Sequence, residues 1–301
     1  MQKKDLILVA LFIGILSLAV AGHYTFAKTG PAPDFLGDPK GFKTYWQERI
    51  DALGGEAAYP LLLKTYASTT PYAQHRIAHT FSGLVYEKEG AKAISMCDDS
   101  FGYGCFHEFA IRIIGARGIS ALQELEAACP VGSSAEISCW SGIGNGIQEY
   151  VGFGKGSLEK AFDICAALNF DSELAKESCY SGAVIHYGKY AVSIPKLPEG
   201  QLVDVCKEVS EKYATLCYRG LPIWLLYSQP DQVDTQFKDM GALCESLLTE
   251  SHIRACFEGI GKYTAYHPAR NYLCTIVSDN PTYQKICEER RQWMNSFIVK
   301  S

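Results

Sequence analysis

The tetrapeptide Cys139-Trp140-Ser141-Gly142 carries a pattern that returns along most of the chain: a cysteine, an aromatic residue, any residue and a glycine. Other copies keep all or part of this pattern. They are Cys179-Tyr180-Ser181-Gly182, Cys217-Tyr218-Arg219-Gly220, Cys256-Phe257-Glu258-Gly259, Cys105-Phe106-His107-Glu108, Thr80-Phe81-Ser82-Gly83 and Cys287-Glu288-Glu289-Arg290. The marker cysteines at 105, 139, 179, 217, 256 and 287 are separated by 34, 40, 38, 39 and 31 residues. A near-constant period of this length is typical of a stacked repeat array.

Each marker cysteine has a second cysteine shortly upstream, so that all 12 cysteines fall into pairs. Twelve cysteines can pair in roughly ten thousand ways, and spacing alone does not normally choose among them. A repeat makes one choice much simpler than the others, because every unit can close its own bridge. The predicted pairs are Cys97 with Cys105, Cys129 with Cys139, Cys165 with Cys179, Cys206 with Cys217, Cys244 with Cys256, and Cys274 with Cys287.

Helix signals place these cysteines on hairpins of two helices. The spacing from Ser133 to Glu136 fits a capping box, and Asn280-Pro281 puts a proline at a first helical position. The marker cysteine then lies about two turns into the second helix, and its partner lies near the end of the first. We expect the glycine to let the two helices of a hairpin approach, and the aromatic residue to fill the core between units. The sequence therefore predicts an all-α fold, an α-solenoid of about seven helical hairpins, six of them with an intra-repeat disulfide.

The N-terminus has the features of a targeting segment. A basic start is followed by an apolar stretch from Leu6 to Gly22, which is shorter than the ~20 residues of a comfortable membrane span. Ala19-Val20-Ala21 fits a signal-peptidase site. We interpret residues 1–21 as a signal peptide or an uncleaved anchor, residues 22–40 as a linker and residues 41–301 as the repeat domain. Either interpretation predicts an extracytoplasmic protein that is secreted, periplasmic or membrane-anchored facing outward, and paired cysteines agree with that.

Composition narrows the function classes. The chain has 301 residues, of which 48% are hydrophobic and 20% charged, so it can bury a substantial core. Its formal net charge of −5 leaves no basic footprint for a nucleic-acid partner. Contact with a membrane is expected only through the N-terminal segment. We find no cofactor motif, and cysteines committed to bridges cannot act as thiol nucleophiles.

Three of the seven histidines, with one glutamate, are the candidates for chemistry. His75 and His79 are four residues apart and so share one helix face. His107 and Glu108 stand in the second marker motif, where Glu108 replaces the glycine. Imidazoles with a carboxylate are typical ligands of a divalent metal such as zinc. We therefore predict a metal site formed by His75, His79, His107 and Glu108 between the first two hairpins, with Glu108 as a ligand or as a base. The alternative is that the histidines are polar surface residues and that Glu108 pairs with Arg112.

The first bridged unit supports a family resemblance. Met96-Cys97-Asp98 followed by Gly104-Cys105 places seven residues between the two cysteines. This unit resembles the secreted cysteine-rich Sel1-like proteins, which are relatives of the tetratricopeptide arrays. The resemblance covers about residues 56–298 in architecture. It implies a protein-binding or peptidoglycan-associated scaffold with a concave groove.

Two main functions follow as hypotheses. The first is an extracytoplasmic helical-repeat scaffold that binds a protein or peptide in a groove. The alternative is a metal-binding protein or a metal-dependent hydrolase that uses the His/Glu cluster of the first two repeats. A purely structural envelope protein is a third hypothesis. The lack of other catalytic motifs favours a protein that is not an enzyme.

Overall fold

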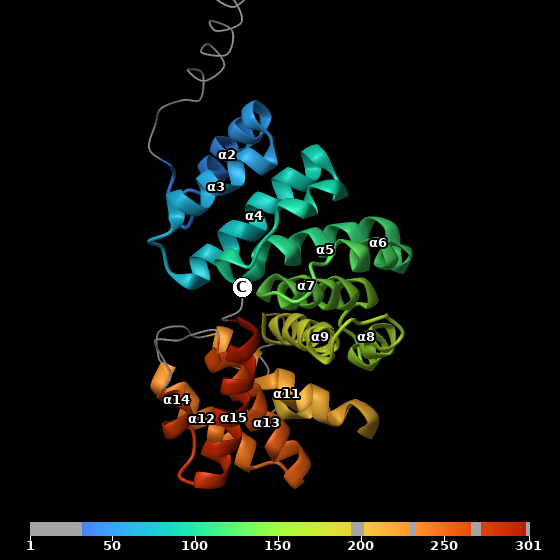
Figure 1. Ribbon diagram of the computed structural model, residues 1–301, viewed down its shortest axis with the longest axis vertical. Coiled ribbons are helices and arrows are strands. Elements are labelled where there is room, and N and C mark those ends of the chain that lie inside the picture. Colours follow the sequence, from blue (N-terminus) through green and yellow to red (C-terminus); the bar gives the residue numbers. More distant parts are fainter. Residues whose placement is uncertain (1–31, 194–201, 229–232, 266–271, 299–301) are drawn as a thin grey trace, which may run out of the picture.

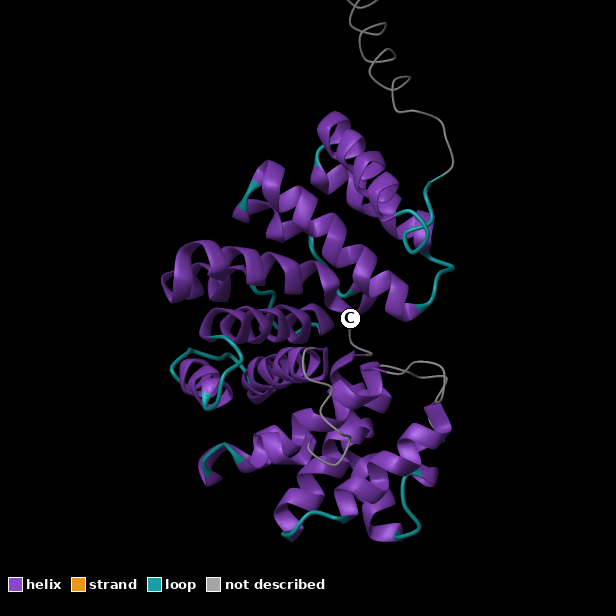
Figure 2. Cartoon of the chain, turned by 180° about the vertical axis from the view of Figure 1, so that it is seen from behind, coloured by secondary structure: helices purple, strands orange, loops and turns teal. Residues whose placement is uncertain are grey.

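The computed structural model describes residues 32–193, 202–228, 233–265 and 272–298. In these ranges every regular element is a helix and no strand occurs (Figure 2). The all-α prediction is therefore confirmed. The predicted signal peptide or anchor at 1–21, and most of the 22–40 linker, lie outside the described residues. The last residues of that linker contact the domain, since Phe35 is 6% exposed and its ring packs 4.9 Å from that of Phe42.

Most helices alternate between a long one that carries the marker motif and a shorter one before it. The first described helix is α2 (Pro39–Leu53). The shorter helices are α3 (Gly55–Tyr66), the 3-10 helix η1 (Ala91–Met96), α6 (Leu122–Ala128), α8 (Ser157–Ala166), α10 (Leu202–Lys207), α12 (Val233–Glu245) and α14 (Leu273–Ile276). The marker helices are α4 (Pro71–Glu89), α5 (Gly104–Arg117), α7 (Ser134–Val151), α9 (Glu173–Ser193), α11 (Glu211–Ser228), α13 (Glu250–Ala265) and α15 (Pro281–Ile298). Short 3-10 turns, η2 (Ser100–Tyr103) and η3 (Gly118–Ala121), complete the described elements.

Consecutive marker helices pack against one another. Contacts run from α4 to α5, then to α7, α9, α11, α13 and α15, and Figure 1 shows α4, α5, α7 and α9 following each other along the longest axis. The aromatic residue of each motif lies inside this stack. Phe81, Phe106, Trp140, Tyr180, Tyr218 and Phe257 are all at most 4% exposed. The core that the motif predicts is thus continuous from one unit to the next.

The motif glycine has a different role from the expected one. A Cβ added to Gly142 would lie 2.8 Å from the Phe106 carbonyl oxygen, and one added to Gly182 would lie 2.1 Å from that of Ser141. Both neighbours belong to the marker helix of the preceding unit, not to the short helix of the same hairpin. The glycine therefore allows neighbouring units to approach closely. This corrects the prediction that it brings together the two helices that the disulfide joins.

Six cysteine pairs lie at disulfide distance, with Cα–Cα separations of 5.5–6.1 Å. They are the six pairs that the repeat predicts, and no cysteine of the chain is left over. In five units the marker cysteine lies well inside its helix. Cys105 is different, because α5 begins at Gly104 and Cys105 is only its second residue.

The start of α15 follows its sequence signal, whereas the start of α7 departs from the predicted capping box. The Thr70 hydroxyl accepts a hydrogen bond of 3.3 Å from the Ala73 amide, and α4 and α15 both begin at a proline. Ser133 precedes α7 but makes no capping hydrogen bond with its side chain. Glu136, which the capping box would turn back to Ser133, instead accepts from the Gly132 amide at 2.8 Å and from the Ser172 hydroxyl at 2.8 Å. Its carboxylate links the starts of α7 and α9.

The C-terminal helices also fold back onto the middle of the stack. Ile137 of α7, Leu174 of α9, Ala265 of α13 and Met294 of α15 form one buried hydrophobic cluster.

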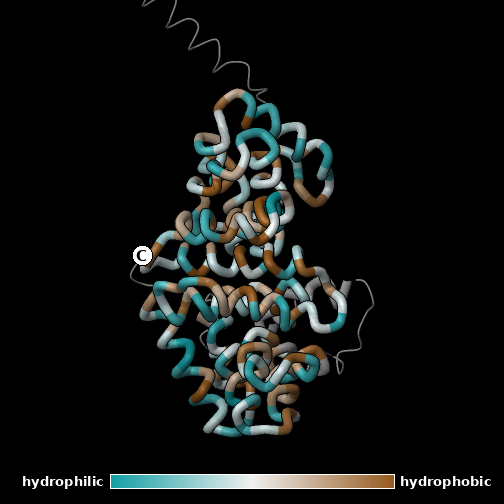
Figure 3. The backbone as a smooth tube through the Cα atoms, turned by 90° about the vertical axis from the view of Figure 1, so that its right-hand side faces the viewer, coloured by the Kyte–Doolittle hydropathy of each residue, from teal (hydrophilic) through white to brown (hydrophobic). Residues whose placement is uncertain are grey.

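Figure 3 shows short hydrophobic and hydrophilic stretches alternating along the helices. Within the described ranges, none of the helices combines the length and the apolar character that crossing a membrane requires.

Candidate metal centre

The site begins with the first turns of α4. Proline at the first position and the Thr70 cap fix the start of this helix. His75 and His79 follow one turn apart on one face, with ring centroids 4.6 Å from each other. Both side chains are half-buried. The helix itself therefore supplies two neighbouring imidazoles.

The third imidazole comes from the next unit and depends on a close backbone contact. A Cβ added to Gly104 would lie 2.5 Å from the His75 carbonyl oxygen and 2.8 Å from the Ala78 Cβ. The first turn of α5 can therefore lie directly against α4. His107, three residues later, has its ring centroid 5.4 Å from that of His75 and 5.6 Å from that of His79. It is 7% exposed.

One ligand nitrogen from each of these three histidines can be chosen so that all lie within 4.8 Å of one another. The predicted set His75, His79 and His107 thus comes together. Glu108, the fourth predicted residue, is close by but lies on the outer side of His79. Its Oε2 is 3.1 Å from the Nδ1 of His79, and its Oε1 accepts a 2.7 Å hydrogen bond from Arg112.

Glu108 is held as an anion by these contacts. Burial favours its neutral form, but the hydrogen bond and charge of His79, together with Arg112, outweigh burial and hold its pKa below the ordinary value. The Arg112 pair that the alternative hypothesis predicted is therefore present. It does not exclude the site, because the same carboxylate also contacts His79. A carboxylate behind an imidazole is a common support for a metal-bound histidine.

His75 is supported in the same way from the other side. Its Nδ1 lies 2.8 Å from the Gly102 carbonyl oxygen. That carbonyl belongs to a short left-handed segment, Phe101-Gly102-Tyr103, with φ of 53°, 61° and 71°. Positive φ is unfavourable for Phe101 and Tyr103, so this backbone is held by its surroundings.

These supports decide which nitrogen of each ring carries the proton. A carbonyl can only accept, so His75 donates from Nδ1, and the ionised Glu108 likewise accepts from the Nδ1 of His79. In the neutral rings both Nε2 atoms then carry lone pairs. These two atoms lie 3.1 Å apart. Two lone pairs at this distance repel unless a proton or a cation lies between them.

The chain matches no protein-family model, no curated protein and no solved structure. The function proposed below therefore depends on the geometry of the site alone.

Sequence reasoning found the imidazoles but missed part of what orients them. Nothing in the sequence marks the Gly102 carbonyl as a partner of His75, because a backbone acceptor has no side-chain signature. The i, i+4 spacing of Glu108 and Arg112 did predict their ion pair, but not that the pair supports His79. His186 of α9 lies outside this site, and its Nε2 is 2.7 Å from the Oε2 of Glu149.

Proposed function

We propose that the protein binds a divalent transition-metal ion through His75, His79 and His107. The observation that carries this proposal is the 3.1 Å contact between the Nε2 atoms of His75 and His79, with both Nδ1 atoms engaged elsewhere. In a tetrahedral zinc site two nitrogen ligands ~2.0–2.1 Å from the metal are ~3.3 Å from each other. A metal ion between the two rings would turn their repulsion into coordination, with His107 completing a three-histidine set.

The chemistry of the ligands limits which metal ions can bind at this site. All cysteines are paired, so the site offers imidazoles without thiolates. Neutral imidazoles suit Zn²⁺ and Cu²⁺, whereas Mg²⁺ and Ca²⁺ prefer oxygen ligands. Three protein ligands leave one position open in a tetrahedral site, and a bound metal would supply a polarised water there. The metal-dependent hydrolase predicted as an alternative is compatible with that open position.

The scaffold that carries the site is proposed to be an α-solenoid outside the cytoplasm. The stacking of α4, α5, α7, α9, α11, α13 and α15 supports successive hairpin repeats, and six cysteine pairs at disulfide distance support an oxidising compartment. A terminal location for the metal follows from this arrangement. The site lies between the first two marker helices, α4 and α5.

Calorimetric titration of metal-depleted protein with Zn²⁺ tests the proposal. We expect the wild type to bind one equivalent and His79→Ala to lose at least tenfold in affinity, because one of three ligands is removed. His252→Ala provides the control, since His252 lies on α13 outside the cluster. Equal Zn²⁺ affinity in the wild type and His79→Ala would place any metal elsewhere and contradict the proposal.

A second candidate is the partner-binding scaffold, for which one surface groove provides support. A groove of about 530 Å³ lies between η3–α6 and α8. Its lining combines apolar side chains, among them Leu122 and Leu168, with the carboxylates Glu126 and Asp163. The complementary occupant is a peptide segment with alternating apolar and basic side chains.

A synthetic basic amphipathic peptide tests the second candidate. Fluorescence anisotropy should show binding that weakens at high salt, because exposed charges are screened, and that Ile119→Glu, at an exposed residue of the groove lining, abolishes. Val131→Glu, at an exposed apolar residue outside the groove lining, is the matched control. Equal binding to both variants would exclude this groove.

A further inference from the structure

The Cys97–Cys105 bridge differs from the other five in its exposure. Cys97 is partly exposed, whereas every other cysteine of the chain is at most 9% exposed. Its ring is also the smallest, with a sequence separation of 8 against 10–14 in the other bridges. Exposed disulfides are the ones that exchange with external thiols. A reductant can therefore reach this bridge while the others are still protected by the fold.

The segment between the two cysteines of this bridge forms one side of the three-histidine site. Residues 98–104 lie between the two cysteines and include Gly102, whose carbonyl holds the Nδ1 of His75 at 2.8 Å. They also include Gly104, which lies directly against the backbone of His75. His107 follows Cys105 by two residues on the first turn of α5. The bridge thus fixes both the orientation of one ligand and the position of another.

The enclosed segment has a conformation that must be held in place. Its left-handed run, 101–103, contains two residues other than glycine, and such backbone persists only where the surroundings determine it. The beginning of the segment is tied down by Asp98, which accepts hydrogen bonds from Tyr59 at 2.8 Å and from the Ser100 amide at 2.9 Å. The left-handed run lies between these bonds and the covalent link at Cys105. Cutting that link removes the constraint next to the Gly102 carbonyl.

We propose that the Cys97–Cys105 bridge is a redox lock on the three-histidine site, and this rests on the metal-binding function proposed above. A thiolate of an external dithiol attacks the sulfur of the partly exposed Cys97, and Cys105 leaves as a thiolate that takes up a proton. The second thiol of the reductant then attacks the mixed disulfide and releases Cys97. The bridge gains two electrons and two protons, and the dithiol becomes a cyclic disulfide. Residues 98–104 are released, His75 loses its orientation, and metal affinity falls.

Limited reduction tests the order and the consequence of bridge opening. The protein is treated with substoichiometric dithiothreitol at neutral pH, alkylated and analysed by peptide mapping, and Zn²⁺ affinity is measured on the same samples. We expect Cys97 and Cys105 to be alkylated first and Zn²⁺ affinity to fall at least tenfold in that species. Reoxidation of an unalkylated portion should restore the affinity.

Paired variants separate this lock from general loss of structure. Cys97→Ser with Cys105→Ser should reproduce the tenfold loss, whereas Cys274→Ser with Cys287→Ser, at the far end of the chain, should keep wild-type affinity. Circular dichroism identifies a variant that fails to fold, and the limited-reduction arm then decides. First opening of any other bridge, or unchanged affinity after Cys97–Cys105 opens, would overturn the lock alone. A fully oxidised wild type that binds no Zn²⁺ would instead overturn the metal-binding function on which it rests.

Discussion

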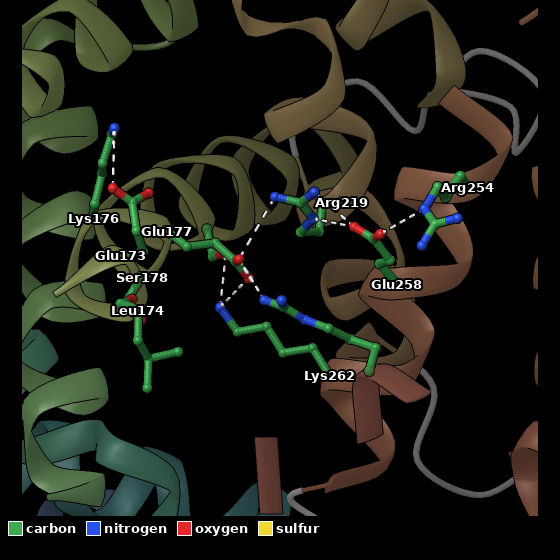
Figure 4. Close-up of polar contacts among 11 residues, drawn as sticks. Glu173, Leu174, Lys176, Glu177, Ser178, Arg219, Arg254, Glu258 and Lys262 are labelled. Atoms are coloured by element: carbon green, nitrogen blue, oxygen red, sulfur yellow. Dashed lines mark hydrogen bonds and ion pairs between the residues drawn. The ribbon is translucent and has the colours of Figure 1, made fainter. Parts of the chain in front are cut away.

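Two polar clusters occupy equivalent places on the repeat but are built in opposite ways. The first is the three-histidine site of α4 and α5. The second, here the Glu177 cluster, joins α9, α11, α13 and α15 through Glu177, Arg219, Lys262 and Arg290. Figure 4 shows Arg219 and Lys262 reaching Glu177 from neighbouring helices. His107 and Arg219 each stand two residues after their marker cysteine, and Glu108 and Arg290 each stand three after theirs. One stripe of the repeat therefore carries both clusters.

The central carboxylate of the Glu177 cluster is paired by cationic side chains of the chain itself. Lys262 is 2% exposed and donates to Glu177 at 3.2 Å and to the Ser181 hydroxyl at 3.1 Å. Arg290 donates to the same carboxylate, and Arg219 lies 3.6 Å from it. Burial alone would raise the pKa of Glu177, but these three cations lower it to about 2. Burial in turn lowers the pKa of Lys262, and the Glu177 carboxylate opposes that shift.

The comparison shows what separates a structural cluster from a binding site. In the Glu177 cluster a carboxylate lies at the centre and cations from three helices surround it, so the group holds α13 and α15 on α9. In the histidine site the carboxylate lies behind an imidazole, and the centre is formed by nitrogen lone pairs. In the first arrangement the charged side chains partner one another, whereas in the second a proton or a cation between the Nε2 atoms of His75 and His79 would remove their repulsion.

The largest expected effect is on the Glu177 cluster. Glu177→Gln removes the central charge and leaves Lys262 and Arg290 buried without it, which should lower the free energy of unfolding by about 3–5 kcal/mol. Urea unfolding with the disulfides intact measures this. Glu173→Gln on the same helix is the control, because the Glu173 side chain is 87% exposed and should change stability by less than ~0.5 kcal/mol. A loss of Zn²⁺ affinity in folded Glu177→Gln would contradict the separation of the two clusters.

The acid dependence of stability should have the same origin. The pKa of Glu177 is about 2 in the fold and near its ordinary value, ~4.3, in the unfolded chain. The unfolded state therefore binds the proton first, so the contribution is present above pH ~4.3 and is lost as the pH falls towards 2. We expect this one group to remove about 3 kcal/mol over that window. The stability curves of wild type and Glu177→Gln should converge near pH 2, and parallel curves would contradict the assignment.

Metal should stabilise the protein through the other cluster only. A ligand that binds the folded state stabilises it by about 2.7 kcal/mol at a free concentration of 100 times its dissociation constant. We expect Zn²⁺ to raise the melting temperature of wild type and of Glu177→Gln, but not that of His79→Ala. Differential scanning calorimetry with and without Zn²⁺ measures the shift. A similar rise in His79→Ala would show that Zn²⁺ acts elsewhere.

The smallest expected effect concerns the support behind His79. Glu108→Gln replaces the anion at the Nδ1 of His79 by a neutral amide, which should weaken Zn²⁺ binding by about 10-fold or somewhat more. Glu87→Gln is the matched control, since Glu87 also contacts Arg112, at 3.2 Å, but is not the carboxylate on His79. Calorimetric titration of both variants measures the difference. A loss greater than that of His79→Ala would indicate that Glu108 is itself a ligand, as the sequence first suggested.

Much of the fold could be predicted because its signals are local. The repeat period, the pairing of cysteines within a unit and the proline at the start of α15 each depend on residues close in sequence. The role of the motif glycine could not be predicted in the same way. Its spacing to the cysteine is local, but the helix that it contacts is chosen by how one unit packs on the next, as Gly182 against Ser141 shows.

The candidate metal site shows the same difference between local signals and contacts that depend on tertiary packing. The sequence by itself determined that His75 and His79 share a helix face and that His107 lies on the next marker helix, because helical periodicity and the repeat register fix those positions. The structure decided that α5 begins at Gly104, which puts His107 on its first turn. Only the tertiary structure decided that the three rings converge, that Glu108 supports His79, and that the Gly102 carbonyl orients His75. It also decided that α13 and α15 close on Glu177. These contacts join residues that are 27 to 113 positions apart in the sequence. A local sequence pattern cannot predict which residues meet over such separations.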